Sequence, residues 1–276
     1  MKCAWKELLS ILPQSIRQDV DRLGRDSLQE LRVRLDRQVE LVRGDGQVFL
    51  KHTARQDDLQ YIVNTASRYS PWAAATAQNG YITAPGGHRI GICGECVVND
   101  RHMTGFRNLT SLCIRIARDF PGIAQRVQPT GSCLIIGPPG YGKTTLLRDL
   151  IRKISENACI TVVDERGEIY PPGGCFRIGN RTDILTGCAK PHGIVTALRT
   201  MGPQWIAVDE ITAQEDCEAL LEACWCGVRL LATAHAATRR DLIGRNVYKP
   251  LVECGVFEWL IILQQDKSWQ MERMKG

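Results

Sequence analysis

The sequence predicts an α/β protein of two domains, a smaller mixed α/β domain followed by a larger one built on a parallel sheet. Three observations lead to this prediction. In the second half, short apolar runs typical of buried strands alternate with amphipathic helices. One of these strands leads through a glycine-rich loop into a helix. Two prolines and two glycines in residues 120–131 mark a break before this pattern. We therefore place the domains at residues 1–127 and 128–276.

The first domain mixes strand and helix patterns. Apolar residues alternate with polar ones from Leu31 to Leu41, which predicts one half-buried strand. A turn at Gly44–Gly46 leads to a returning strand. Leu59 to Tyr69 have the apolar spacing of a helix, and two further strands are predicted over residues 89–98 and 111–118.

In the second domain the elements alternate regularly. Strands are predicted at residues 133–136, 159–163, 205–208 and 228–232, and helices at residues 143–154, 191–201 and 212–226. Proline begins the second of these helices and glycine ends the third, as is common at helix ends. Such alternation predicts a sheet covered on both faces.

Composition and charge narrow the class of protein. No apolar run approaches the roughly 18 to 20 residues of a membrane span, and the amphipathic start lacks a secretory apolar core. We therefore expect a cytoplasmic protein. The net charge is +5, and residues 1–130 carry 18 Lys and Arg against 13 Asp and Glu. This surplus fits a solvated surface, a membrane, a nucleic acid or another subunit's nucleotide.

Cysteine is abundant, with 12 residues in the chain. Without a secretory segment we expect reduced thiols, buried at Cys133 and Cys159 in apolar runs and at Cys217 on a helix face. Cys93 and Cys96 form a lone CxxC pair. Because a structural zinc needs four ligands, we expect a structural role for the thiols rather than a metal site.

The strongest functional motif is a phosphate-binding loop of the pattern G-x-x-x-x-G-K-[ST], set between a strand and a helix. Its glycines let backbone N–H groups point at phosphate oxygens, and the helix directs its positive end to the same place. Lys143 would reach the β- and γ-phosphates, and Thr144 would bind Mg²⁺. The predicted ATP-binding residues are Gly137, Pro138, Pro139, Gly140, Tyr141, Gly142, Lys143, Thr144 and Thr145.

A second motif, WIAVDE, ends an apolar strand in two carboxylates. Asp209 would hold the magnesium ion, and Glu210 would orient and polarise the attacking water. The paired acids favour hydrolysis over simple binding. The competing interpretation is a strand that runs into an acidic helix start.

Two further strand ends carry candidate residues. Glu165, in TVVDERGEI, would position water or magnesium, because carboxyl ends of parallel strands gather around a ligand. A solvated acidic loop is the alternative. His235, in LLATAHA, would sense the γ-phosphate, although a lone histidine is more often a surface or core residue.

These motifs together resemble the stage III sporulation protein AA family, which is related to the type II and type IV secretion ATPases. The resemblance covers GPPGYGKTTLLRDL, VVDERGEI, LRTMGPQWIAVDEI and ATAHA, together with LQELRVRL, GGHRIGICGE and IRIAR in the first domain. It implies a RecA-like ATPase domain, a hexameric ring, and the roles given above for Lys143, Thr144, Asp209, Glu210, Glu165 and His235. The glycine-rich residues that precede the histidine in secretion ATPases are missing here, and no four-cysteine zinc module is present.

The resemblance also implies a place in the cell. The protein would lie on the mother-cell side of the forespore membrane, dock on an integral membrane partner, and power or assemble a secretion-like channel.

Multimeric ATPases often complete their sites with a neighbour's arginine. Candidates are Arg89, Arg107, Arg115, Arg118 and Arg199, and we favour the first three.

We thus expect a magnesium-dependent ATPase that converts ATP and water to ADP and phosphate. One rival is a RecA-like ATPase stimulated by nucleic acid, which the basic first domain suggests. Few residues follow Leu263 in this sequence, and they carry no nucleic-acid-binding pattern, so we expect no such partner. The other rival is a scaffold in which ATP binding drives ring assembly and hydrolysis is incidental.

Overall fold

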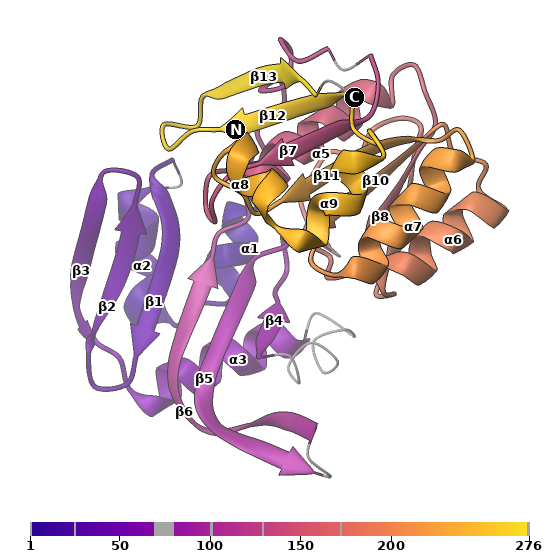
Figure 1. The fold of residues 1–276 in the computed structure, drawn as a ribbon. Coiled ribbons are helices and arrows are strands. Elements are labelled where there is room, and N and C mark those ends of the chain that lie inside the picture. The colour runs from indigo at the N-terminus through magenta and orange to yellow at the C-terminus, as the bar shows by residue number, and fades with distance from the viewer. Residues whose placement is uncertain are drawn as a thin grey trace. The chain divides into compact units, whose positions relative to one another are not determined.

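A computed structural model describes residues 2–24, 26–68, 80–99, 102–128, 130–171 and 173–274 (Figure 1). The chain divides into two compact units. The first comprises Met1–Asp119 and Pro171–Phe176, and the second comprises Phe120–Tyr170 and Arg177–Gly276. The first unit thus runs to Asp119 and also takes in a short segment from within the second half of the chain, while the domain boundary near residue 127 stays a prediction.

An antiparallel sheet in the order β3-β2-β1-β6-β5-β4 forms the core of the first unit. Alternate residues of β1, including Leu31 and Val33, are buried against the helices of this unit, whereas Arg32 and Arg34 point the other way. The elements of this unit are α1 (Trp5–Ser10), α2 (Gln14–Leu23), β1 (Leu28–Arg34), β2 (Gln38–Arg43), β3 (Gly46–Thr53), α3 (Gln56–Arg68), β4 (Tyr81–Thr83), β5 (Arg89–Asn99) and β6 (His102–Arg115).

One prediction for this unit was wrong, because residues 31–41 do not form a single strand. The chain reverses at Asp36, whose φ of 58° lies in the left-handed region. Aspartate tolerates this conformation because its short polar side chain costs little there. The alternating pattern continues through the turn, so periodicity gave no sign of it. The predicted helix is α3, and Tyr69, its predicted last residue, lies outside the described residues.

His88 joins three segments of the first unit. Its side chain is fully buried. Nδ1 accepts a hydrogen bond from the Ala117 N–H at 3.1 Å, so Nε2 carries the proton and donates to the Ala4 carbonyl at 2.9 Å. Burial lowers the pKa of this imidazole below its ordinary 6.5, and the charge of Glu7 opposes that shift.

This arrangement predicts a loss of stability in mild acid. Since the folded state favours neutral His88, its stabilisation is complete above pH 6.5, the ordinary pKa, and is lost as the pH falls. We expect the free energy of unfolding to drop by about 1–2 kcal/mol between pH 7.5 and pH 5. Urea unfolding at both values measures it. His88→Gln is the control, and an equal drop in that variant would assign the effect to other groups.

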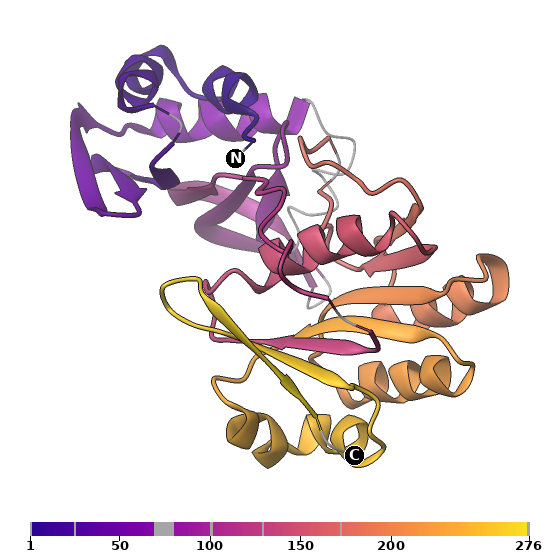
Figure 2. The same cartoon turned by 90° about the horizontal axis from the view of Figure 1, so that it is seen from above.

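The second unit contains a sheet in the order β13-β12-β7-β11-β10-β8-β9, in which only β13 runs antiparallel to its neighbour. Side chains of α6, α7 and α9 share a core cluster with one face of this sheet, and Figure 2 shows α5 on the other face. The elements are β7 (Cys133–Ile136), α5 (Lys143–Ile154), β8 (Ile160–Asp164), β9 (Thr182–Thr186), α6 (Lys190–Thr200), β10 (Trp205–Glu210), α7 (Gln214–Trp225), β11 (Arg229–Ala234), α8 (Arg239–Gly244), the 3₁₀ turn η1 (Asn246–Tyr248), α9 (Lys249–Glu253), β12 (Trp259–Leu263) and β13 (Trp269–Arg273).

The predicted strands and helices of this unit occur in the predicted order, with shifts at their ends. Strand β8 begins at Ile160, so the preceding Cys159 is exposed, contrary to the prediction of a buried thiol. Cys133 and Cys217 are buried as predicted, and none of the twelve cysteines, all of which lie among the described residues, forms a disulfide. Within the part of the chain that the structure describes, every helix is too short or too polar to cross a bilayer.

Candidate nucleotide site

The phosphate-binding loop connects the carboxyl end of β7 to the first residue of α5, as the motif requires. Strand β7 is completely buried, which fixes the start of the loop. Gly140 and Gly142 have φ values of 77° and 98°, a conformation that favours glycine. Backbone strain would therefore accompany a side chain at either position.

A second element holds this loop from the carboxyl end of β12. A Cβ atom on Gly137 would lie 3.1 Å from the Cβ of Leu263, so the loop begins in close contact with that strand. In the turn after β12, Lys267 donates a hydrogen bond from Nζ to the Gly140 carbonyl at 2.5 Å and lies 5.5 Å from the Tyr141 ring centroid. Lys267 was not among the predicted site residues, because no local pattern relates this turn to the loop.

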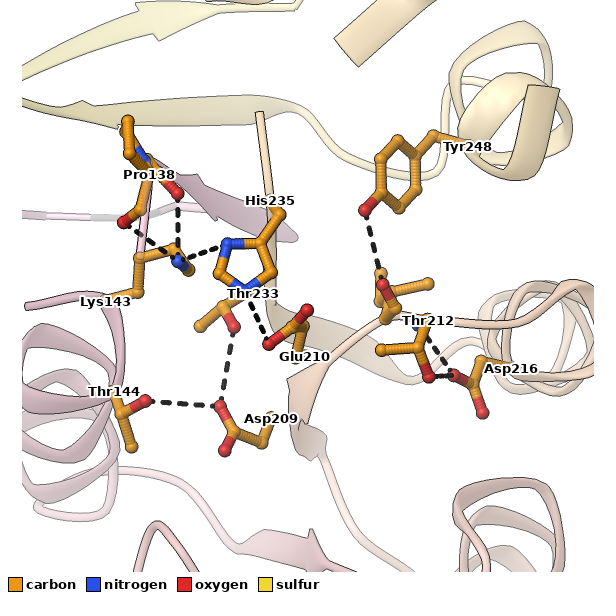
Figure 3. A network of polar contacts seen from close by, with 12 residues as sticks. Pro138, Lys143, Thr144, Asp209, Glu210, Thr212, Asp216, Thr233, His235 and Tyr248 are labelled. Carbon is orange, nitrogen blue, oxygen red and sulfur yellow. Dashed lines mark hydrogen bonds and ion pairs between the residues drawn. The ribbon is translucent and has the colours of Figure 1, made fainter. Parts of the chain in front are cut away.

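Lys143 lies within the loop with its ammonium group enclosed (Figure 3). Nζ donates to the carbonyl oxygens of Gly137 at 2.9 Å and Pro138 at 3.3 Å, and to Nδ1 of His235 at 2.9 Å. Burial lowers the pKa of this ammonium, and the negative charges of Glu210 and Asp209 oppose that shift. The group thus faces carbonyl and imidazole acceptors that an anionic phosphate would replace.

His235 connects Lys143 to the acidic end of β10. Because an ammonium group can only donate, Nδ1 of His235 is the acceptor, and Nε2 carries the ring proton. That nitrogen lies 2.8 Å from Oε2 of Glu210. Figure 3 shows the three side chains in line, with Lys143 and Glu210 on opposite sides of the imidazole. The structure therefore brings together three predicted site residues from separate elements.

Asp209 occupies the floor of the site beneath this line of side chains. The hydroxyl groups of Thr144 and Thr233 each lie 3.4 Å from its Oδ1. Burial, followed by the charges of Glu168, Asp164 and Glu210, raises the pKa of the Asp209 carboxyl to about 7. Thr233 is fully buried and was not predicted as a site residue, although it belongs to the motif that contains His235.

These groups fit a bound magnesium ion. Mg²⁺ prefers carboxylate and hydroxyl oxygens and usually takes only one or two protein ligands, completing its shell with water and phosphate. Asp209 and Thr144 supply such oxygens side by side. The raised pKa of Asp209 shows that negative charge is costly at this point, so a cation would be complementary. Among the described residues no group of three or more His, Cys, Asp or Glu is arranged to hold a metal by itself.

The Asp209 carboxyl predicts a pH-dependent affinity for magnesium nucleotide. Its folded pKa of about 7 exceeds the ordinary 3.8, so between these values folding takes up a proton and stability falls as pH rises. Magnesium needs the ionised form. We expect Mg·ADP to bind about tenfold more weakly at pH 6 than at pH 8. Titration calorimetry measures this, and the same pH difference in Asp209→Asn would refute it.

The end of β8 and the loop after it carry three acids, among them Glu165, whose predicted role toward water or magnesium stays a prediction. Glu165 binds Lys190, with 2.9 Å between its Oε2 and Nζ. Asp164 is buried and accepts backbone N–H groups of Glu168, Ile169 and Tyr170 at 2.8, 3.0 and 2.8 Å. Among the nearby carboxylates, Glu168 contributes most to the raised pKa of Asp209 through its negative charge. The structure therefore places the charge of Glu168 near the site, whereas Glu165 is held in an ion pair.

The predicted arginine fingers lie on the sheet of the first unit. Arg89 stacks 3.9 Å from the Tyr81 ring centroid, Arg107 pairs with Glu95 at 2.9 Å, and Arg115 lies 3.5 Å from Glu30. Arg118 donates to the Leu28 carbonyl, and Arg199 is exposed on α6 of the second unit. The action of these arginines on a neighbour's nucleotide stays a prediction. Cys93 and Cys96 are exposed on β5.

Comparison with known proteins assigns both the family and the fold. The family model for "Sporulation stage III, protein AA" matches residues 4–274. Stage III sporulation protein AA of Bacillus subtilis is 35% identical over 98% of this chain and 92% of that protein. The Legionella pneumophila ATPase DotB has a TM-score of 0.59 at 15% identity, covering 89% of this chain and 76% of that one. The pilus retraction motor PilT with bound ADP has a TM-score of 0.59 at 16% identity, covering 90% and 76%.

The structural neighbours carry the predicted fold. An α/β protein with a RecA-like P-loop domain after a smaller mixed α/β domain is therefore confirmed. Their low identity shows the fold alone, so the roles of individual side chains depend on the geometry described above.

Proposed function

Because this chain belongs to the sporulation stage III protein AA family, we propose that it is a magnesium-dependent ATPase that powers or assembles a sporulation-specific secretion-like channel. The observation that carries the enzymatic part is the convergence of Lys143, His235 and Glu210 above Asp209 and Thr144. Asp209, Glu210 and His235 lie at the carboxyl ends of the adjacent strands β10 and β11, where ligands bind in open α/β sheets, and Lys143 and Thr144 begin the helix that follows the loop after β7.

In the proposed mechanism the loop backbone and Lys143 hold the triphosphate. Backbone N–H groups at the start of α5 point toward the phosphates, and the positive end of that helix adds to the attraction. Lys143 exchanges the Gly137 and Pro138 carbonyls for phosphate oxygens. Bound magnesium would neutralise phosphate charge, and Thr144 with Asp209 would hold it.

Glu210 is the proposed general base. His235 holds one carboxylate oxygen, Oε2, at 2.8 Å, which orients the carboxylate while Oε1 accepts a hydrogen bond from water. The water oxygen forms a bond to the γ-phosphorus while one of its protons passes to Oε1 of Glu210, the bond from the γ-phosphorus to the bridging oxygen breaks with its electron pair going to that oxygen, and ADP leaves. When Lys143 turns to the phosphates, His235 loses its donor at Nδ1. The imidazole is thereby placed to respond to the γ-phosphate.

We further propose the quaternary and cellular setting that the family implies. The protein would form a homo-hexamer in which Arg89, Arg107 or Arg115 reaches a neighbour's nucleotide. It would act in the cytoplasm on the mother-cell side of the forespore membrane and dock on an integral membrane partner. The side chains of Arg107 and Arg115 are largely exposed on β6, which supports this proposal.

Two measurements on the purified chain test this function. Phosphate release from ATP, with and without magnesium, should show turnover only with the metal. Light scattering after size-exclusion chromatography should show a hexamer with a slowly hydrolysed ATP analogue. Failure to bind ATP with magnesium at millimolar concentrations would refute the ATPase. Strong, salt-sensitive stimulation by single-stranded DNA or RNA would instead favour the nucleic-acid-dependent rival.

A further inference from the structure

Lys190 occupies an unusual position for a lysine. It is the first residue of α6, where the positive end of the helix opposes a cation, and only 7% of it is exposed. An ammonium group is buried at such a place only when its partners compensate for the lost water. Lys190 has two partners, Glu165 at 2.9 Å and Asp216 at 3.5 Å.

These two carboxylates come from segments that leave adjacent strands. Glu165 directly follows β8, and Asp216 lies in the first turn of α7, which follows β10. Strands β8 and β10 are parallel neighbours, with Val163 opposite Val208. Lys190 therefore bridges the two chain segments that run on from the strands carrying Asp164 and Glu210.

Asp216 also binds the chain segment that follows Glu210. Its Oδ2 accepts the backbone N–H groups of Thr212 at 2.9 Å and Ala213 at 3.2 Å, and the Thr212 hydroxyl at 3.3 Å. Asp216 is 4% exposed, and the ammonium group of Lys190, 3.5 Å away, compensates the charge of this buried carboxylate. Figure 3 shows Asp216 reaching back to Thr212.

The segment is also held from its other side. The buried Tyr248 donates its hydroxyl proton to the Ile211 carbonyl at 3.3 Å, and the Ile211 N–H bonds the Thr233 carbonyl at 2.9 Å. Backbone contacts at residues 211–213 thus fix the chain just beyond Glu210. Of the charged side chains in this arrangement, Asp216 supplies the direct contact and Lys190 compensates its charge.

We propose that Lys190 is a positioning residue for Glu210, acting through Asp216. The proposal rests on the ATPase function given above. Lys190 compensates the charge of the buried Asp216 carboxylate, Asp216 holds residues 212 and 213, and their fixed backbone sets the direction of the Glu210 carboxylate. Without Lys190 the segment loosens, and the water-orienting carboxylate loses its alignment while the phosphate-binding loop is untouched.

Kinetics of Lys190→Met, Lys190→Arg and Lys153→Met test this inference. Lys153 is a control lysine, because its Nζ also donates to two backbone carbonyls, those of Gln125 and Val127, but at the far end of α5. We expect Lys190→Met to lower kcat at least about tenfold while KM for ATP changes less than about twofold. Lys190→Arg should restore part of kcat, and Lys153→Met should keep the parental value. A parental kcat in Lys190→Met would overturn the proposal.

A second readout does not need hydrolysis. Amide hydrogen exchange of the peptide covering residues 211–213 should be at least about tenfold faster in Lys190→Met and unchanged in Lys153→Met. If the parent chain hydrolyses no ATP, the proposed function fails, whereas the exchange rates still decide the role of Lys190. Unchanged exchange in folded Lys190→Met would refute it.

Asp216→Asn is a further test of this proposal, and it replaces Lys190→Met if that variant does not fold. The amide keeps an acceptor for Thr212 and Ala213 but removes the charge that Lys190 compensates. We expect a loss of kcat similar to that in Lys190→Met, and no further loss when both changes are combined. Additive losses, or a parental kcat in Asp216→Asn, would show that Lys190 does not act through Asp216.

Discussion

Lys143→Ala should lower kcat/KM for ATP by about 100- to 1000-fold, the range observed when one donor to developing transition-state charge is removed. The buried ammonium of Lys143 is the cation held inside the loop, between two loop carbonyls and His235. Removing this ammonium group leaves a bound triphosphate without the positive charge of Lys143 beside it. Steady-state hydrolysis and binding of a fluorescent ATP analogue measure the two effects.

The matched control is Lys153→Ala, on the same helix. Lys153 donates to the Gln125 and Val127 carbonyls, so its loss should lower stability without a specific loss of turnover. Thermal melting of both variants separates folding from catalysis. If Lys143→Ala bound and hydrolysed ATP like the parent, the loop would not be the site of phosphate binding.

Glu210→Gln should bind ATP with nearly parental affinity yet turn it over about 100- to 10,000-fold more slowly, as expected for loss of a general base. The amide is close in size to the carboxylate, and its oxygen still accepts the Nε2 proton of His235, so the local structure should persist. Single-turnover hydrolysis and equilibrium ATP binding give the chemical step and the affinity separately.

Glu215→Gln is the control for this change, because Glu215 is an exposed acid in the first turn of α7. It should hydrolyse ATP at the parental rate. Parental hydrolysis by Glu210→Gln would show that another group serves as the base. If Glu210→Gln supported sporulation in cells while Lys143→Ala did not, nucleotide binding alone would suffice, as the scaffold rival requires.

Among the site residues, those within short motifs could be predicted from local sequence. The loop from Gly137 to Thr145 follows the buried strand β7, and the pair Asp209–Glu210 ends strand β10, whose other residues are buried. Apolar runs of strand length identify such strands, and their carboxyl ends must meet at one edge of a parallel sheet. Phosphate and magnesium chemistry then limits which side chains can act there.

The roles of Glu165, Lys190 and Lys267 could not be predicted in the same way. Glu165 directly follows the buried strand β8, much as Glu210 ends β10, but Lys190 holds Glu165 in an ion pair. Lys190 comes from the start of α6 and Lys267 from the turn before β13, each far along the chain from its partner. No local spacing encodes contacts of this kind.

The turn at Asp36 also could not be predicted from local sequence. A period of two residues records which side chains face a core, but it does not record whether the chain runs on or folds back. The reversal depends on the left-handed backbone of Asp36 and on its N–H bonding the Ala54 carbonyl across the sheet.

The sequence alone determined the α/β class of the nucleotide-binding domain, the order of its strands and helices, and the loop with its lysine and strand-end acids. These depend on the burial periodicity of short segments and on the chemistry of neighbouring residues. Only the tertiary structure decided which acid faces Asp209, how His235 joins Lys143 to Glu210, and what Lys190 holds. Hydrogen bonds and ion pairs act over a few ångströms, so they are set by which distant segments the packed sheet brings together.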